Sequence, residues 1–198
     1  MKNVFLLIFV VSFAVVAMSF SSREKKVILI DVGHGGDDIG AQIDGFSEKE
    51  ITLQIANKLK AMNAAEAFEI VLTRNGDHFL SYDEKVAMVK SIQPSLILSI
   101  HVNKAPNKSL SGMEIYHSSD ENVGAIALPY ADKLQAFIKD INHNVTIKSS
   151  NFQVFKLDQS IPTLLIELGF LSNNEDLKLL SSEEGQTQIA TAILKSLM

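Results

Sequence analysis

Residues 27–36 read Val-Ile-Leu-Ile-Asp-Val-Gly-His-Gly-Gly. The apolar, largely β-branched run that ends at the glycines predicts a strand buried on both faces of a sheet. Residues 96–103, Leu-Ile-Leu-Ser-Ile-His-Val-Asn, have the same form. Each run brings a histidine, His34 or His101, to the end of a strand. Open α/β sheets gather their ligands at this edge, so the sequence predicts that the two imidazoles are a pair of metal ligands.

The rest of the chain alternates predicted strands with amphipathic helices. Strand patterns occupy 26–32, 68–73, 95–102, 112–117, 152–156 and 163–168. Helical patterns occupy 48–62, 82–92, about 129–141 and 186–197; 103–111 and 118–127 are expected to be polar loops, and 142–151 a polar connection. This order predicts an α/β fold: a single three-layer domain with an about six-stranded, mostly parallel sheet and helices on both faces.

Two of the predicted helices have recognisable starts. Ser47, followed three residues later by Glu50, is a capping-box pattern, and it places Glu48 in the first turn of its helix. Pro129 suits the first turn of a later helix, because the N–H that proline lacks has no partner there.

The N-terminus has the pattern of an export signal. The chain has 198 residues, enough for one domain with a full core and too few for two comfortable ones. Lys2 and the apolar residues 4–18 form the basic and hydrophobic parts of the signal. We expect residues 1–22 to be a signal peptide or an N-terminal membrane anchor, and residues 23–198 to be the functional domain. The protein is therefore expected in the periplasm or the cell envelope.

Composition excludes several kinds of function. The sequence has no cysteine, so disulfides, thiol nucleophiles and zinc–thiolate sites are excluded, and any metal must be held by His, Asp or Glu. The formal charge is −5, with 18 basic and 23 acidic residues; residues 1–22 contribute only Lys2, so 17 basic residues remain without them and the charge is −6. Such a domain is not suited to bind nucleic acid through bulk charge.

Glu48 is the third candidate metal ligand. Two imidazoles and one carboxylate suit Zn²⁺, and three protein ligands leave a fourth position for water, as a catalytic zinc site requires. The predicted site is therefore His34, Glu48 and His101. Nearby glycines would let the backbone turn tightly around an ion where a Cβ would crowd it: Gly33, Gly35 and Gly36.

The glycine loop also invites a different hypothesis, a phosphate cradle between a strand and a helix. Asp37 and Asp38 follow the glycines directly and would repel a phosphate, and no lysine lies where it could reach one. The metal hypothesis is therefore favoured.

Glu167 lies near the end of the apolar run 163–168. A carboxylate in such a place has a desolvation cost unless it is paired, hydrogen-bonded or facing a cleft. If it faces the metal, it can take a proton from water and hand it to a leaving nitrogen. The alternative is an acid that points outward from an edge strand, which the apolar flanks disfavour.

Three further polar residues have predicted supporting roles. Asn103, two residues after His101, is a candidate for a hydrogen bond to substrate. Asp31 could accept the free N–H of a ligand histidine or brace the glycine loop. Arg74 is expected to hold a structural ion pair rather than a substrate.

Six strings occur in the order IDVGHGGDDIGA, SEKEITLQIANKL, VLTRNGD, LILSIHVN, GMEIYHS and IPTLLIELGFLSN. As a set, they resemble the zinc-dependent N-acetylmuramoyl-L-alanine amidases that cleave bacterial cell wall. The resemblance implies a six-stranded sheet between helices, Zn²⁺ on the predicted triad and a catalytic glutamate at Glu167. It also implies hydrolysis of the amide bond between N-acetylmuramoyl and L-alanine in peptidoglycan or muropeptides.

The chain departs from the family's pattern at Lys85, where an arginine is common. Arginine and lysine are not interchangeable in bidentate contacts, so a supporting salt bridge is expected to be weaker or rewired. Some family members carry an inserted helix that plugs the zinc site until a partner removes it. The interval from His117 to Phe152 is short, and the helix predicted there fills much of it. We therefore expect no obligatory activator protein.

Two other functional hypotheses remain open. The triad fixes the type of reaction better than the substrate, so a zinc amidohydrolase or peptidase for another small acyl-amino acid also fits. A catalytically silent cell-wall-binding protein is the second, although it would have no chemical need for all three ligands and Glu167. In either case residues 1–22, where retained, would tether the protein to a membrane.

Overall fold

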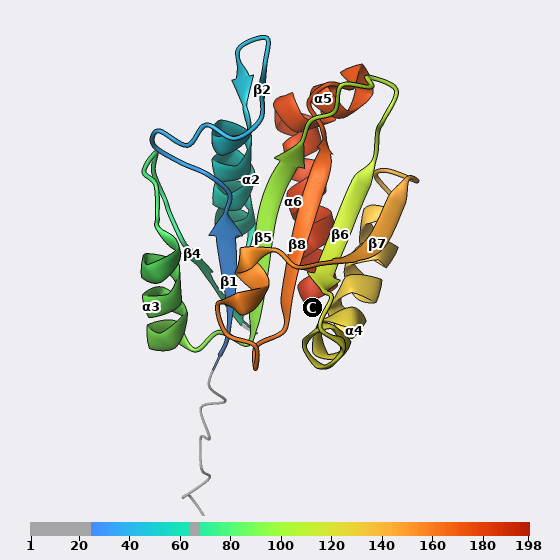
Figure 1. Cartoon of the computed structure of the whole chain (residues 1–198). Helices are drawn as coiled ribbons and strands as arrows, with labels where there is room; N and C mark the ends of the chain where they lie inside the picture. Colours follow the sequence, from blue (N-terminus) through green and yellow to red (C-terminus); the bar gives the residue numbers. More distant parts are fainter. Residues whose placement is uncertain (1–24, 64–67) are drawn as a thin grey trace, which may run out of the picture.

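The computed structural model describes residues 25–63 and 68–198, which are built around a six-stranded sheet (Figure 1). The strand order is β4-β1-β5-β8-β6-β7. The strands are β1 (Lys26–Val32), β4 (Phe68–Leu72), β5 (Leu96–Asn103), β6 (Met113–Ser118), β7 (Val145–Ser150) and β8 (Thr163–Phe170). All neighbours are parallel except β6 and β8, which are antiparallel. The predicted single α/β domain with a mostly parallel sheet is confirmed.

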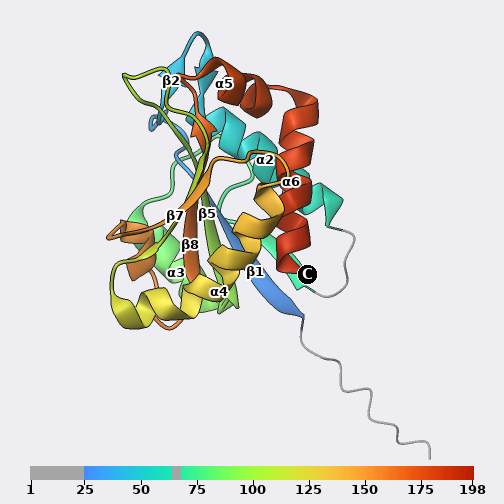
Figure 2. The same cartoon turned by 90° about the vertical axis from the view of Figure 1, so that its right-hand side faces the viewer.

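Three helices cover one face of the sheet (Figure 2). They are α2 (Glu48–Met62), α4 (Glu121–Ile138) and α6 (Glu183–Leu197), and the short α5 (Asn174–Ser181) leads from β8 into α6. Side chains alternate across a strand, so every second residue of the central strands, such as Ile28 and Ile30 of β1, points to this face. These residues form the larger hydrophobic core together with the three helices.

The opposite face is covered only in part, by α3 (Tyr82–Ile92) and the 3₁₀ helix η1 (Gln153–Lys156). A smaller core lies between these elements and the N-terminal halves of β1 and β5: Leu29, Val89, Ile97, Leu157 and Ile161. Beyond it, the C-terminal halves of the strands carry polar side chains on the same face: Asp31, Ser99, His101, Asn103 and Glu167. The candidate site residues therefore lie where the cover ends.

The helices expected at 48–62 and 82–92 have those bounds in the structure. Ser47 is the N-cap of α2, but its hydroxyl donates to the Glu50 carboxylate at 2.7 Å and caps no backbone N–H, so the expected capping box is not formed. Just before α2, β2 (Gln42–Ile43) and β3 (Phe46–Ser47) form a hairpin. Both residues of its Asp44-Gly45 turn have positive φ, as tight hairpin turns require.

The sixth strand is not where the sequence predicts it. Residues 152–156 form η1 rather than a strand, and the expected connection 142–151 contains β7. In β7, Val145 is buried whereas most neighbouring side chains are polar, and a half-polar edge strand is recognised only when its partner β6 is known. In η1, Phe155 is buried, because these apolar residues cover the sheet instead of extending it.

The loop expected at 118–127 is also wrong. The Asp120 carboxylate accepts hydrogen bonds from two N–H groups of the first turn, so α4 begins directly after it. Pro129 consequently lies inside the helix instead of in its first turn. It is exposed, so a carbonyl left without its N–H partner can be hydrated. The last helix, α6, begins at Glu183 rather than 186, and α5 is not predicted.

No helix in residues 25–63 and 68–198 combines the length and the apolar character needed to cross a membrane. The predicted signal or anchor at 1–22 lies outside the described residues, as does its boundary with the domain predicted at 23–198.

Candidate metal centre and active site

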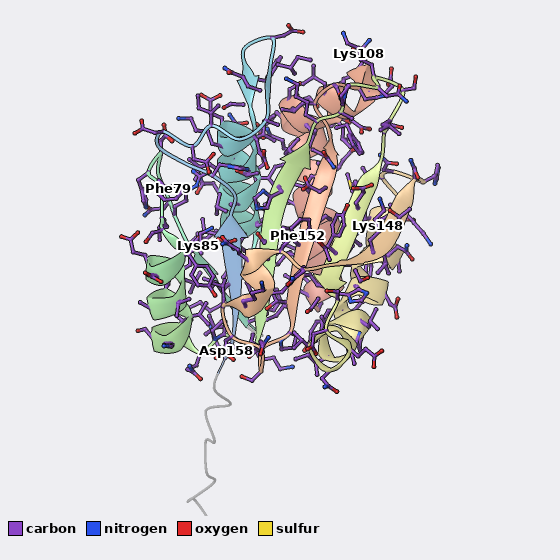
Figure 3. The ribbon with its side chains drawn as sticks, viewed as in Figure 1. Phe79, Lys85, Lys108, Lys148, Phe152 and Asp158 are labelled. Carbon is purple, nitrogen blue, oxygen red and sulfur yellow. The ribbon has the colours of Figure 1, made fainter. Side chains whose placement is uncertain are left out.

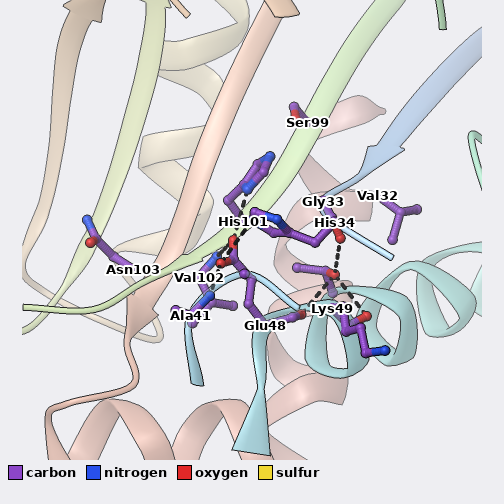
Figure 4. Close-up of polar contacts among 12 residues, drawn as sticks. Val32, Gly33, His34, Ala41, Glu48, Lys49, Ser99, His101, Val102 and Asn103 are labelled. Atoms are coloured by element: carbon purple, nitrogen blue, oxygen red, sulfur yellow. Dashed lines mark hydrogen bonds and ion pairs between the residues drawn. The ribbon is translucent and has the colours of Figure 1, made fainter. Parts of the chain in front are cut away.

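His34, Glu48 and His101 come together at the ends of β1 and β5 (Figure 4). Glu48 Oε2 lies 3.0 Å from Nε2 of His34, and Glu48 Oε1 lies 2.9 Å from Nδ1 of His101. One ligand atom from each residue lies within 4.8 Å of the others. The structure thus brings together the three predicted metal ligands from three separate segments of the chain.

The backbone holds the Glu48 carboxylate from both sides. Its Oε2 accepts a hydrogen bond from the Ala41 N–H at 2.8 Å, and its Oε1 accepts one from the Val102 N–H at 3.0 Å (Figure 4). The Glu48 side chain is buried. Glu48 is also the first residue of helix α2, where the helix dipole favours a negative charge. The carboxylate is therefore fixed between the two imidazoles.

The loop around His34 passes very close to the other two ligands. His34 has a left-handed backbone, with φ of 61°, which is strained for a residue with a side chain. A Cβ on Gly33 would lie 2.8 Å from the His101 ring, and one on Gly40 would lie 2.5 Å from Oε2 of Glu48. Glycine at these two positions therefore allows the close approach, as expected for Gly33; Gly40 is not among the predicted glycines.

Arg74 braces both ligand segments from the buried side. Its Nη2 donates to the Gly33 carbonyl at 2.8 Å and to the Lys49 carbonyl at 2.7 Å. These two residues lie directly before His34 and directly after Glu48 in the sequence. Hydrogen bonds to backbone carbonyls thus take the place of the ion pair expected for Arg74.

Asp31 binds Lys85 and Ser99 instead of a ligand histidine. Its Oδ1 lies 2.8 Å from Lys85 Nζ, and its Oδ2 accepts a hydrogen bond from the Ser99 hydroxyl at 2.8 Å. Burial works against ionisation of Asp31, but the Lys85 ammonium, with smaller contributions from His101 and the Ser99 hydroxyl, holds the pKa of Asp31 below its usual value. Lys85, where the resemblance implies an arginine, therefore forms an ion pair.

The charges of the triad favour a cation. Burial disfavours the ionised form of Glu48, yet hydrogen bonds from His101 and His34 hold its pKa well below the usual range. Burial also opposes protonation of His34, but Glu48 and Asp38 raise the pKa of His34 to about 9. A divalent ion between the same atoms would take the place of these protons, because metal and proton compete for the same donors.

Glu167 stands beside the triad, opposite His101 in the register of β5 and β8. The side chain is half-buried, and its Oε2 has no hydrogen-bond partner among the described residues. Burial raises the pKa of Glu167 to about 7; nearby Glu48 adds to the rise and His101 opposes it. A buried carboxylate oxygen without a partner fits a reactant held at the neighbouring cluster. The donor set and this oxygen together fit Zn²⁺.

A polar group that the sequence analysis missed adjoins Glu167 on its other side. Glu114 of β6 is in register with Glu167. It accepts a hydrogen bond from the Tyr116 hydroxyl at 2.7 Å and forms an ion pair with Lys148 of β7. Asn103 Nδ2 lies 3.4 Å from the same carboxylate, and its contact with substrate stays a prediction.

The sequence contains a signal for this group, but only in combination with the fold. Residues 113–118 alternate buried Met113 and Ile115 with the polar Glu114 and Tyr116. The alternation shows that β6 has one polar face. That this face is shared with Glu167 follows only once β6 is known to pair with β8.

A cavity of about 300 Å³ opens beside the triad, between α3 and η1. His34 and His101 line one end. Phe79, Tyr82 and Leu157 are among the residues that line the rest. The candidate metal centre is therefore open to a ligand on this face of the sheet.

The sheet is mostly parallel, and at one edge it carries two histidines and a glutamate with a second glutamate beside them. This combination is typical of hydrolase domains with a metal site, and the protein belongs to this class. The chain belongs to the N-acetylmuramoyl-L-alanine amidase family Amidase_3, whose profile matches residues 28–198.

Similar proteins support this membership. The chain is 37% identical over 177 residues to the uncharacterized protein YqiI of Bacillus subtilis (strain 168), which covers 88% of this chain and 84% of YqiI. It is 34% identical over 172 residues to the N-acetylmuramoyl-L-alanine amidase LytC of the same strain; this covers 85% of the chain and 34% of LytC. The chain thus spans about a third of the length of LytC.

Two solved structures share the fold. The catalytic domain of CwlV, an N-acetylmuramoyl-L-alanine amidase from Bacillus (Paenibacillus) polymyxa var. colistinus, has a TM-score of 0.79 and 27% identity, with 87% of this chain and 96% of that chain covered. The CwlD amidase from Clostridioides difficile, in complex with the GerS lipoprotein, has a TM-score of 0.77 and 27% identity over the same shares. The resemblance and the enzyme class inferred from the motifs are confirmed. Because CwlD was solved with a lipoprotein, the expectation of no activator stays a prediction.

Proposed function

We propose that this chain hydrolyses the amide bond between N-acetylmuramoyl and L-alanine in peptidoglycan, with Zn²⁺ held by His34, Glu48 and His101. The observation that carries the proposal is the buried Oε2 of Glu167, which has no hydrogen-bond partner within residues 25–63 and 68–198 and lies next to this cluster in an amidase-family fold. Bound there, Zn²⁺ supplies Lewis acidity, which activates water near neutral pH and polarises a carbonyl.

Glu167 moves the proton. It accepts a proton from the attacking water at a carboxylate oxygen and passes it to the nitrogen that leaves. The carboxylate stands one strand away from His101, within reach of a reactant held beside that ligand. Asn103, two residues along β5 on the same face, is proposed to hydrogen-bond the substrate.

We also propose that the chain acts outside the cytoplasm, in the periplasm or the cell envelope. Lys2 and the apolar residues 4–18 support export, and the family's substrate lies in the cell wall. Cell fractionation combined with N-terminal sequencing of the mature protein tests this, because cleavage and retention of residues 1–22 give different N-termini.

The test of the function is digestion of purified sacculi, with mass spectrometry of the released peptides and metal analysis of the same sample. We expect new free L-alanine amino termini, about one zinc per chain, and a release by Glu167→Gln that is slower by about 10²–10⁴-fold. Cleavage only of other acyl-amino acids would replace the proposal with the more general amidohydrolase. Binding to sacculi without any release would indicate a silent wall-binding protein.

A further inference from the structure

The two sides of the metal centre differ in their chemistry. Figure 3 shows Phe79 on the α3 side of the sheet and Lys148 on the β7 side, with Phe152 between them. His101 and Glu167 occupy neighbouring strands in the middle of this face. A substrate that reaches Glu167 therefore has an apolar, aromatic protein surface on its α3 side and a charged protein surface on its β7 side.

The α3 side suits an uncharged group with apolar faces. Its cavity of about 300 Å³ is at the lower end of small-molecule sites, which favours one sugar unit with its acyl chain over a long glycan. Phe79 and Tyr82 are exposed at its edge and offer aromatic surface. The charges of Asp31 and Lys85 in the lining are paired with each other at 2.8 Å, and the carboxylate of Asp38, also in the lining, lies 2.9 Å from Nδ1 of His34.

The β7 side suits a peptide that carries a carboxylate. Lys148 forms an ion pair with Glu114, and its side chain is 45% exposed. An ammonium group has three donors, so Lys148 can bind a second carboxylate from solvent while it keeps the first. The Tyr116 hydroxyl fixes Glu114 in place, and the Tyr116 ring packs edge-on against Phe152.

The proton transfer sets the direction. In amide hydrolysis the water oxygen bonds to the carbonyl carbon, the C–N bond breaks with its electron pair going to nitrogen, and that nitrogen takes the proton from Glu167. Strand β8, which carries Glu167, lies between β5 and β6, on the side of His101 that faces away from the cavity. The leaving nitrogen is the first atom of the peptide, so the peptide must continue toward β6.

We propose that the substrate crosses the metal centre in one direction, with its muramoyl part in the cavity between α3 and η1 and its peptide part over β6 and β7, where Lys148 binds a peptide carboxylate. This proposal rests on the amide hydrolysis proposed above. It adds the orientation of the substrate and two residues, Phe79 and Lys148, that select its two ends.

The experiment varies the two ends of the substrate separately. One pair of N-acetylmuramoyl peptides ends in a carboxylate or in the matching carboxamide; a second pair carries the same peptide on N-acetylmuramoyl or on a lactyl group without sugar. For Lys148→Met we expect KM to rise about three- to tenfold for the carboxylate and to stay unchanged for the carboxamide. For Phe79→Ala we expect a similar rise with the sugar present and no change without it.

Two variants serve as controls. Lys148→Arg should keep the preference for the carboxylate, and Lys133→Met, on the exposed side of α4, should match the wild type. The proposal is overturned if the effects are exchanged. In that case the KM of Lys148→Met would rise only for compounds with the sugar, and the KM of Phe79→Ala would rise only for compounds with the carboxylate. Equal effects on both members of each pair also overturn it.

A second readout separates this proposal from the proposed function. Calorimetry with Glu167→Gln measures binding of the same four compounds without turnover, and the same pattern of losses is expected in the double variants with Lys148→Met or Phe79→Ala. If the wild type hydrolyses none of the compounds, the proposed function fails. The binding pattern still supports or overturns the orientation in that case.

Discussion

His101 of β5 and Glu167 of β8 occupy the same register position on adjacent parallel strands. Neighbouring strands lie about 4.8 Å apart, so the sheet itself sets the distance between a candidate metal ligand and the proposed proton carrier. Neither residue depends on a loop for its position. Sites built on strands keep their geometry more faithfully than sites built on loops.

Removing one ligand should remove the metal. We expect about one zinc per chain in the wild type and a loss of most of it in His101→Ala, because two remaining ligands bind Zn²⁺ far more weakly than three. Metal analysis by mass spectrometry checks this. His143→Ala, in an exposed connection, is the matched control and should keep its zinc. Full zinc occupancy in His101→Ala would contradict the assignment.

Glu167→Gln should separate catalysis from metal binding. Glutamine has nearly the same shape but cannot carry the proton, so we expect turnover to fall by about 10²–10⁴-fold while zinc content and thermal stability stay close to the wild type. Single-turnover kinetics together with metal analysis measure both. Near wild-type turnover in this variant would move the proton-transfer role to another group.

Arg74→Met should destabilise the fold and weaken zinc binding together. The substitution removes the hydrogen bonds of the guanidinium to the carbonyls of Gly33 and Lys49, which keep their weaker contacts with the Thr52 hydroxyl at 3.0 and 3.3 Å. A hydrogen bond from a charged donor contributes about 1.5–3 kcal/mol. Urea unfolding and a zinc competition assay check the two effects. Lys90→Met, at an exposed position of α3, is the control. A destabilised Arg74→Met that binds zinc as tightly as the wild type would show that the brace does not reach the ligands.

The Asp31–Lys85 pair should stabilise the protein only above acidic pH. The folded-state pKa of Asp31 is lower than its usual value of 3.8, so its contribution is present above that pH and is lost as the pH falls through the folded-state pKa. In Lys85→Met, burial raises the pKa of Asp31 and only the weaker effects of His101 and the Ser99 hydroxyl oppose it, so the pKa is higher than in the wild type. We expect the difference in unfolding free energy between wild type and Lys85→Met to be largest near pH 7 and to shrink below about pH 4. A difference independent of pH would assign the effect of Lys85 to packing.

The purified protein should be active without a partner. Helix α4, which lies between β6 and β7 in the chain, packs on the face of the sheet opposite the metal centre, and the side chains of His34 and His101 remain 22% and 21% exposed. Of the two segments around α4 expected to be polar, 118–127 contains the start of α4 and 142–151 contains β7. Neither segment covers the site. Turnover of a soluble muropeptide is measured with the protein alone and after addition of cell-envelope extract. A large rise caused by a protein in the extract would show that an activator is needed.

The clustering of the three candidate metal ligands could be predicted because its signals are local. Each candidate histidine lies at the end of a buried apolar run, and the Ser47/Glu50 pattern predicts the correct helix start at Glu48 although the capping box itself is not formed. The sequence alone therefore places all three at one edge of a parallel sheet. Glu167 could be found for a similar reason: a carboxylate in an apolar strand is rare unless it has a function.

The parts that could not be predicted depend on tertiary contacts. The sequence pattern predicts a strand at the apolar residues of η1 and a loop at the mixed residues of β7, but the structure shows the reverse. Pairing with β6 makes β7 the edge strand, whereas η1 packs over β1. The partners of Arg74 are backbone carbonyls. Every residue has a carbonyl, so the sequence does not show which of them Arg74 binds. Glu114 lies next to Glu167 because β6 and β8, which are far apart in the sequence, pair in antiparallel orientation.

The hydrogen bonds of Arg74 tie together segments that are distant in the sequence. The carbonyls of Gly33, before His34, and of Lys49, after Glu48, share one guanidinium, which comes from the loop just after β4. A chimera that exchanges the glycine loop or the start of α2 with a relative must therefore carry the segment around Arg74 with it. In evolution or in engineering, these three pieces of chain form one inherited unit, although only two of them touch the metal site.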